Sequence, residues 1–143
     1  MVKCGRFSNV HLLEFNIHEN HESNVMWAAL EHTLHIGFED IAHTELLPTS
    51  GLKTHIFVLS QDKGIESAIF NAVWVCFVLH GVPLKRSIYH HQWEQGHAIY
   101  DLNDPETIIS GEYSALPSEE GVQACLSYKE SVLAFLERDW HRW

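Results

Sequence analysis

Histidines at a spacing that suits metal chelation occur twice in this sequence. His18 and His21 form one pair, and His32 and His35 form the other. Residues three apart lie on one face of a helix, so His32 and His35 are placed to share a metal ion. A zinc site takes three or four protein ligands, and the spacing supplies no third ligand. Packed or surface histidines are therefore the favoured interpretation, and neither a metal nor a cofactor is predicted.

Aromatic and imidazole rings surround a second position, the predicted turn at residues 93–96. Rings on two neighbouring strands can line a pocket for a flat ligand such as adenine. Ordinary cross-strand packing is the alternative, and it needs no ligand. The rings belong to Tyr89, His90, His91, Trp93, His97 and Tyr100.

Carboxylates at the ends of predicted elements are the acid–base candidates. They are Glu39, Asp40, Glu45, Glu94, Asp101 and Asp104. Most carboxylates are solvated surface charges, and the spacing singles out none of these. The sequence also lacks the G-x-S-x-G, H-E-x-x-H, Walker and G-x-G-x-x-G motifs. It therefore carries no strong catalytic signature.

The elements that would position these groups alternate between strands and helices. Strands are predicted over 10–17, 41–47 and 53–59, with a turn at 48–51 and a strand pair between 87 and 102. One helix is predicted from a cap at Asn20 or Ser23 to Gly37, and a second from a cap at Ser60 or Asp62 to Gly81. A third helix begins at Pro117, after a loop that contains Gly111. This order predicts one α+β domain over 1–143, a ferredoxin-like β-α-β-β-α-β sandwich with an extra C-terminal helix.

The second predicted helix, 65–80, is apolar nearly all round. Its core face is expected to carry Ile65, Ala68, Ile69, Ala72, Val73 and Cys76, and its opposite face Phe70, Trp74, Phe77 and Val78. Such a helix must be covered on both sides. One cover is the sheet, and the other is the C-terminal helix or another subunit, so a homo-oligomer is expected.

The formal charge is −10 with histidines neutral. Nucleic acid is not expected as a partner, because phosphate binding needs clustered Lys and Arg. An acidic surface suits a basic protein partner, or solubility alone. Protonation of all twelve histidines would bring the charge to −10 + 12 = +2, so charge-dependent association is expected to respond to mild acid.

Cysteine usage and hydropathy predict a cytoplasmic protein. The three cysteines include no C-x-x-C pair, which argues against a disulfide scaffold and favours a reducing compartment. The most apolar stretch, 68–79, is far shorter than a membrane span, and no apolar run follows the first residues as in a signal peptide.

Short matches in the second half of the chain resemble the small phage-encoded enzymes that degrade S-adenosylmethionine (SAM), the SAM lyases. The matching positions are Lys53-Thr54, Asp62-Lys63, Ala72, Cys76, Gly96, Tyr100, Gly111-Glu112-Tyr113, Pro117 and Cys125. The resemblance implies a ferredoxin-like fold, a trimer with SAM bound at subunit interfaces, and a host-cell cytoplasmic role against host defence. It also implies cleavage of SAM to methylthioadenosine and homoserine lactone, a reaction that needs mainly preorganisation and a nearby acidic group.

The chain departs from that family at two positions. Ser50-Gly51-Leu52 stands where the family has a glutamate before the central strand, and His43-Thr44 stands where a tyrosine is expected. Glu45 is then the nearest carboxylate that could accompany the sulfonium. The resemblance makes Glu45 the catalytic candidate. The substrate-binding candidates are Tyr89, His91, Trp93 and Tyr100.

Two other functions remain open from the sequence. The first is an acidic, non-enzymatic inhibitor, such as an immunity or anti-defence protein, that blocks a basic site on a partner. The second is a metal-dependent enzyme that uses the histidines. The SAM-binding or SAM-cleaving protein is the leading expectation, and the acidic inhibitor is its alternative.

Overall fold

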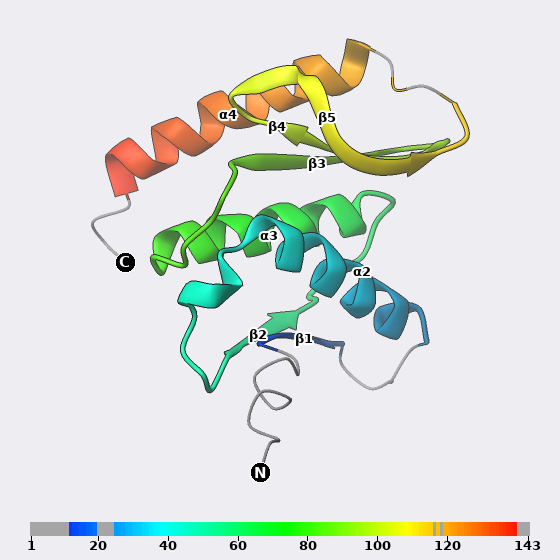
Figure 1. Ribbon diagram of the computed structural model, residues 1–143. Coiled ribbons are helices and arrows are strands. Elements are labelled where there is room, and N and C mark those ends of the chain that lie inside the picture. The colour runs from blue at the N-terminus through cyan, green and yellow to red at the C-terminus, as the bar shows by residue number, and fades with distance from the viewer. Residues whose placement is uncertain (1–11, 20–24, 116, 118, 140–143) are drawn as a thin grey trace. The chain divides into compact units, whose positions relative to one another are not determined.

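The computed structural model describes residues 12–19, 25–115, 117 and 119–139 (Figure 1). Within these residues the chain forms two compact units, one from the described parts of 1–63 with 81–85 and the other from 64–80 with 86–143. The described elements are three α-helices, a short 3₁₀ helix, and five strands in two sheets. The α+β class predicted from the sequence is confirmed, as is the C-terminal helix.

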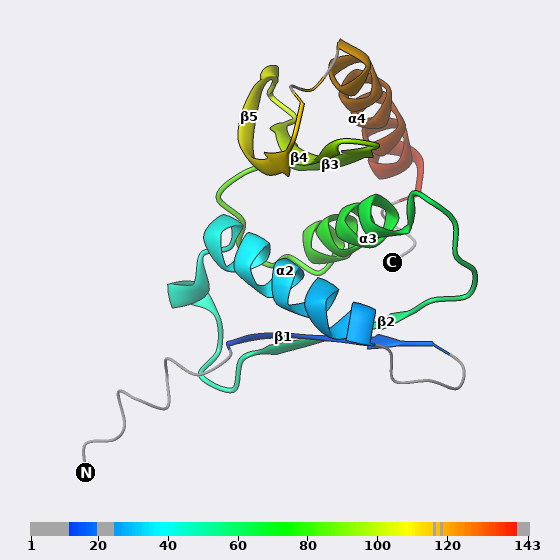
Figure 2. The same cartoon turned by 90° about the vertical axis from the view of Figure 1, so that its right-hand side faces the viewer.

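The first unit is a two-stranded parallel sheet with one helix on it. β1 (Leu13–His18) and β2 (Leu52–Phe57) pair in parallel, and α2 (Val25–Ile41) connects them in sequence. Alternate residues of β1 face α2, and the Phe15 and Phe38 rings lie 5.7 Å apart between sheet and helix. Figure 2 shows α2 along one face of the two strands. The residues of α2 buried in this unit are Trp27, Leu30, Leu34, Phe38 and Ile41.

Polar side chains of α2 occupy the outer edge of β1. The backbone N–H of Ile17 donates to the Glu31 carboxylate over 2.7 Å, and Nδ1 of His35 lies 2.9 Å from the Leu13 carbonyl oxygen. An unpaired strand edge leaves backbone groups without partners, so two side chains one helical turn apart replace a neighbouring strand here.

Two predictions for this unit are wrong. The helix does not stop at Gly37 but continues to Ile41, because Phe38 and Ile41 extend its buried stripe. The predicted strand over 41–47 is absent: Ala42 makes one antiparallel bridge to Leu84, and a 3₁₀ helix follows over Thr44–Leu46. The capping residues Asn20 and Ser23 lie outside the described residues.

The second unit is a three-stranded antiparallel sheet with a helix on each face. Its strands follow one another in space as in sequence: β3 (Ile88–Trp93), β4 (Gly96–Asp101) and β5 (Asp104–Tyr113). The predicted strand pair around 93–96 is confirmed by the register Trp93 to Gly96. The helices are α3 (Ile65–Leu79) and α4 (Glu119–Asp139) (Figure 1).

Neighbouring residues of β3 point to opposite helices. The Phe70 ring of α3 stacks on His90 at 4.5 Å, and the Tyr128 ring of α4 lies 4.8 Å from Tyr89. The alternation of side chains along a strand therefore places α3 on one sheet face and α4 on the other.

The structure corrects three details of the sequence analysis in this unit. Residues 104–113 form β5 rather than a loop with Gly111. The N-cap of α3 is Gly64 and not Ser60 or Asp62. The aromatic side of α3 is the buried one, with Phe70, Trp74 and Phe77 at most 5% exposed, whereas Ala68, Ala72 and Cys76 are exposed. Large rings lose more contact with water on burial than alanine does, so they occupy the inner face.

The strands therefore follow the ferredoxin-like plan in part. β1 and β2 pair in parallel, as that plan requires. Within the described residues, however, β3, β4 and β5 form a separate sheet. None of the described helices is both long and apolar enough to cross a membrane.

Candidate functional site

The four ring residues predicted as a ligand pocket lie together on one face of the antiparallel sheet. Tyr89, His91 and Trp93 alternate along β3, and Tyr100 of β4 is the register partner of Tyr89. The Tyr89 hydroxyl lies 3.4 Å from Nδ1 of His91. The ring centroids of His91 and Trp93 are 6.0 Å apart. The sheet thus gathers these four side chains. His90 and His97, the other two rings of the predicted pocket, lie on the opposite face and stack on one another at 5.2 Å.

Helix α4 packs onto this same ring cluster. The Tyr128 ring lies against Tyr89, and a Cβ placed on Gly121 would lie 2.2 Å from the Tyr100 hydroxyl oxygen. Tyr100 is 1% exposed and Cys125 is fully buried, and within the described residues the Tyr100 hydroxyl has no hydrogen-bond partner. Packing between sheet and helix therefore accounts for most of the cluster, which is the interpretation that needs no ligand.

Burial also sets the charge of this cluster. Desolvation raises the pKa of the hydroxyls of Tyr89, Tyr100 and Tyr128, and the nearby Cys125 thiol raises these pKa values further. Desolvation lowers the pKa of His91, which the Glu120 carboxylate opposes. The cluster is thus uncharged at neutral pH, with tyrosines protonated and His91 neutral.

The predicted catalytic residue Glu45 belongs to the other unit. It lies exposed on the 3₁₀ helix Thr44–Leu46, and its Oε1 is 3.0 Å from Nδ1 of His43. A backbone hydrogen bond and then the His43 side chain hold the pKa of Glu45 below its usual value. Glu45 is therefore an ionised surface carboxylate, without the burial that would tune a carboxyl for acid–base catalysis.

A serine–histidine contact that the sequence analysis did not identify lies on the other face of the antiparallel sheet. Ser67 Oγ of α3 is 2.8 Å from Nδ1 of His90, which is 2% exposed. Burial, and then the neighbouring His97 and His91, lower the pKa of His90 to about 3. A general base works best with a pKa near the working pH, so His90 is a satisfied core histidine rather than a catalytic one.

Asn71 closes the edge of β3 next to this contact. Its carboxamide nitrogen donates to the His90 carbonyl over 3.0 Å, and its oxygen accepts from the His90 N–H over 2.8 Å. One side-chain amide thus replaces the peptide group of a neighbouring strand. β3 is an occupied edge at this position.

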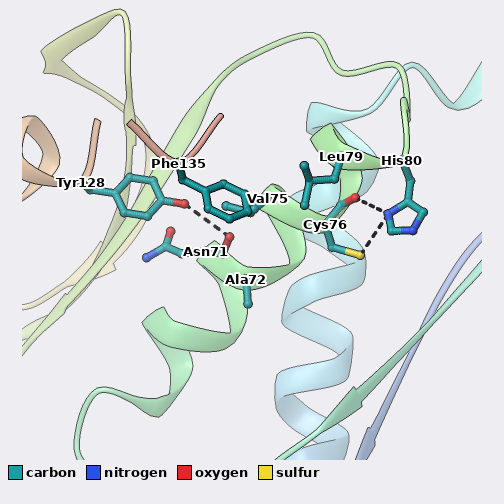
Figure 3. A pocket seen from close by; sticks show the side chains of 8 residues that line it. All are labelled: Asn71, Ala72, Val75, Cys76, Leu79, His80, Tyr128 and Phe135. Atoms are coloured by element: carbon teal, nitrogen blue, oxygen red, sulfur yellow. Dashed lines mark hydrogen bonds between the residues drawn. The ribbon is translucent and has the colours of Figure 1, made fainter. Parts of the chain in front are cut away.

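An apolar pocket lies between α3 and α4 (Figure 3). Its volume is about 480 Å³, and its lining is Asn71, Ala72, Val75, Cys76, Leu79, His80, Tyr128 and Phe135. The Tyr128 hydroxyl donates to the Asn71 carbonyl over 3.4 Å, and Nδ1 of His80 lies 2.8 Å from the Cys76 carbonyl oxygen. This lining carries no carboxylate, lysine or arginine, so it offers nothing to pair with the charged groups of SAM.

The histidine pairs at metal spacing do not form the site that the spacing suggested. Nδ1 of His35 contacts the Leu13 carbonyl and its Nε2 lies 3.1 Å from Glu39, while His32 is exposed. His21 lies outside the described residues. Among the residues that the structure describes, no group of three or more His, Cys, Asp and Glu side chains gathers in a metal-binding arrangement.

The second unit carries an acidic run that we call the acidic segment, residues 87–128. Residues 7–52 are a comparable run, with seven carboxylates and no lysine or arginine. The acidic segment likewise contains no lysine or arginine. Its carboxylates are Glu94, Asp101, Asp104, Glu106, Glu112, Glu119 and Glu120, and all but Asp101 are exposed. The overall charge was predicted to matter, but neither run was identified, although the long gaps between basic residues, Arg6 to Lys53 and Arg86 to Lys129, show both.

β5 combines this charge with an open strand edge. Within the described residues β5 pairs only with β4, so the backbone groups on its other side have no strand partner. Gly111 of β5, the register partner of Ala98, lets β5 lie close to β4: a Cβ on Gly111 would lie 2.6 Å from the His97 carbonyl oxygen. Glu106 and Glu112 are exposed along β5.

Comparison with known proteins adds a fold but no function. No protein-family model matches the chain, and no curated protein matches it either. Among solved structures the chain is similar to Rrp46 from rice (Oryza sativa), with a TM-score of 0.62 and 15% sequence identity over 89% of this chain and 73% of that chain. A likeness at this identity supports the α+β fold alone.

Proposed function

We propose that this protein is an acidic, non-enzymatic binding protein that takes an extended basic segment of a partner protein. The observation that carries the proposal is the edge of β5, which pairs only with β4 among the described residues and lies within the acidic segment, where seven carboxylates occur without lysine or arginine. A field of one sign steers an oppositely charged partner and disfavours partners of the same charge. The cytoplasm, a reducing compartment, is the proposed location, because Cys76 and Cys125 are both free thiols.

The open edge of β5 supports strand addition as the binding mode. An added strand gains main-chain hydrogen bonds from the edge, and its side chains determine specificity. Lysine or arginine side chains on that strand would lie beside Glu106 and Glu112. The same carboxylates disfavour pairing of β5 with a second copy of itself, since like charges would then lie along both strands.

A designed peptide tests this proposal. An extended peptide of alternating Lys and Val should bind, and its Glu–Val counterpart should not, when isothermal calorimetry is done at low salt. Raising the salt should weaken binding, because exposed charges are screened. Methylating alternate backbone nitrogens of the peptide keeps its charge but removes its hydrogen-bond donors, so it should abolish binding. Equal affinity for the methylated peptide would reject strand addition.

Two matched double variants locate the surface. Glu106→Gln with Glu112→Gln should weaken binding by about threefold to tenfold, the effect of losing two exposed ion pairs. Glu130→Gln with Glu137→Gln removes the same charge from exposed positions of α4 beyond the acidic segment, so it should leave affinity nearly unchanged. Equal losses from both would mean that only overall charge matters, and that result would overturn the assignment to β5.

A second candidate function is binding or cleavage of SAM. It is supported by the gathering of Tyr89, His91, Trp93 and Tyr100 on one sheet face, with Trp93 and Tyr113 at its turn end 5.7 Å apart. In this proposal the chain acts as a homo-oligomer, a trimer, in the cytoplasm of a host cell, and Glu45 remains the catalytic candidate.

The chemistry of this second candidate is direct to assay. The SAM carboxylate attacks the carbon next to sulfur, the carbon–sulfur bond breaks, and methylthioadenosine leaves with homoserine lactone as the other product. Incubation with SAM followed by chromatography detects methylthioadenosine, and native mass spectrometry gives the subunit number. Absence of both product and binding heat would remove this candidate.

A further inference from the structure

The outer face of the β1–β2 sheet carries two histidines in direct contact. Nε2 of His18 lies 3.0 Å from Nδ1 of His55, and both side chains are exposed. Their ring planes are within 25° of parallel, with centroids 5.3 Å apart. The Phe57 ring stacks on His18 at 4.9 Å on the side away from α2. His18 was half of an H-x-x-H pair in the sequence, but the structure gives it a partner on the neighbouring strand.

We infer that His18 and His55 together bind a divalent transition-metal ion such as Zn²⁺. Imidazole nitrogen is a preferred ligand for zinc, copper and nickel. Two nitrogens bound to one ion at about 2.0–2.1 Å lie about 2.9 Å apart at a right angle and about 3.3 Å apart at a tetrahedral angle. The observed separation of 3.0 Å lies within this range. In place of the shared proton, the ion would take a lone pair from each ring.

The surroundings of the pair suit an exposed chelate completed by water. Both histidines lie on strands, which hold their Cα atoms in fixed register: His55 is the partner of Asn16, and His18 is the partner of Phe57. The contact of His18 with Phe57 limits the rotation of its ring, so less side-chain entropy is lost when the ion binds. Asn16, the register partner of His55, lies on the same outer face.

Metal binding would connect β1 to β2 across a sheet of only two strands. Such a sheet is marginally stable by itself, so a bond across it should raise the temperature at which the protein unfolds. The inference is independent of the proposed function, because the histidine pair belongs to the first unit and the acidic segment to the second.

Titration of the whole protein with Zn²⁺ at pH 7.5 tests the inference. We expect one ion per chain, bound with the modest affinity of two protein ligands completed by water, and a higher melting temperature at saturating Zn²⁺. At pH 5.5 binding should be lost, because both imidazoles must be deprotonated to coordinate. His18→Gln and His55→Gln should each weaken the affinity by at least about tenfold, since each removes one of two protein ligands. The matched control is His32→Gln, which removes an exposed histidine from α2 and should change nothing.

Nuclear magnetic resonance of the imidazole nitrogens gives a second, sharper readout. With Zn²⁺ bound, the coordinated nitrogens should be Nε2 of His18 and Nδ1 of His55, the two atoms that face one another. Two results would overturn the inference. One is Zn²⁺ affinity that is the same in both variants as in the parent chain or absent altogether, and the other is coordination through different nitrogens or different histidines.

Discussion

His90 is a histidine that burial keeps neutral. Ser67 partners its Nδ1, Phe70 stacks on its ring, and its backbone is bonded to Asn71. Its pKa falls from 6.5 to about 3, mainly through burial. Between these two values the unfolded chain binds a proton that the folded chain does not, so stability falls as pH decreases through that window.

This linkage predicts that the free energy of unfolding changes measurably with pH. From pH 6 to pH 4, His90 should remove about 1 kcal/mol of unfolding free energy per pH unit. His90→Phe and His90→Gln should both flatten the slope, whatever their effect on stability at pH 7, while the exposed His32→Gln should not. Urea unfolding at several pH values measures it. An unchanged slope in both His90 variants would contradict the assignment.

The two described cysteines should differ in reactivity. Cys76 is exposed at the apolar pocket, whereas Cys125 is fully buried and desolvation raises its pKa from 9.0 to about 11. This rise lowers the thiolate fraction of Cys125 at pH 8 by about 100-fold, and the thiolate is the form that reacts. In a Cys4→Ser background, iodoacetamide should modify Cys76 quickly and Cys125 only on unfolding. Fast labelling that survives Cys76→Ser would show that Cys125 is accessible.

At the scale of elements, the contact of α4 with the sheet depends on one glycine. Gly121 is buried against the Tyr100 hydroxyl, so a methyl group there forces one of the two to move. We expect Gly121→Ala to cost about 1–3 kcal/mol, the usual cost of overpacking a core. Adding Tyr100→Phe removes the hydroxyl and should restore part of the loss. Gln123→Ala, on the exposed side of α4, is the control in thermal unfolding.

A double-mutant cycle makes that expectation specific. If Tyr100→Phe gives the Gly121→Ala chain no recovery, the two groups do not compete for the same space. The packing of α4 on the ring cluster would then need another explanation.

Elements with a strong periodic pattern were predictable, and elements set by tertiary context were not. The helix over 65–79 and the strand pair around residues 93–96 follow from local sequence. The segment 41–47 has strand-like composition, yet among the described residues it forms a single β-bridge, Ala42 to Leu84, and continues as a 3₁₀ helix. β5 was missed because Pro105 and Gly111 suggest a loop, whereas at a sheet edge both residues are tolerated.

The ring cluster shows the same limit for the candidate site. The strand pair that carries these rings was predicted, and alternation along β3 places Tyr89, His91 and Trp93 on one face. Whether such a face lines a pocket or packs under a helix depends on what covers it. Here α4 covers the rings, because Gly121 leaves room for the helix to approach Tyr100. Gly121 is thirty positions beyond His91, so the periodicity of the strands could not predict that the helix covers this face.

The whole molecule combines a large negative charge with twelve histidines. The carboxylates stay ionised from pH 8 to pH 6, while exposed histidines gain protons there, so the negative charge diminishes without any change in the acidic segment itself. Association with a basic partner should therefore depend on pH as well as on salt.

Binding of the basic Lys–Val peptide measures this dependence on pH. The affinity for the Lys–Val peptide should fall several-fold between pH 8 and pH 6 at constant ionic strength, because long-range attraction scales with net charge. The salt dependence should become shallower over the same interval for the same reason. Calorimetry at both pH values and two salt concentrations measures both effects, and circular dichroism verifies that the fold is intact. Affinity that stays constant with pH while remaining sensitive to salt would mean that the carboxylates act locally and that the histidines do not contribute to the field the partner meets.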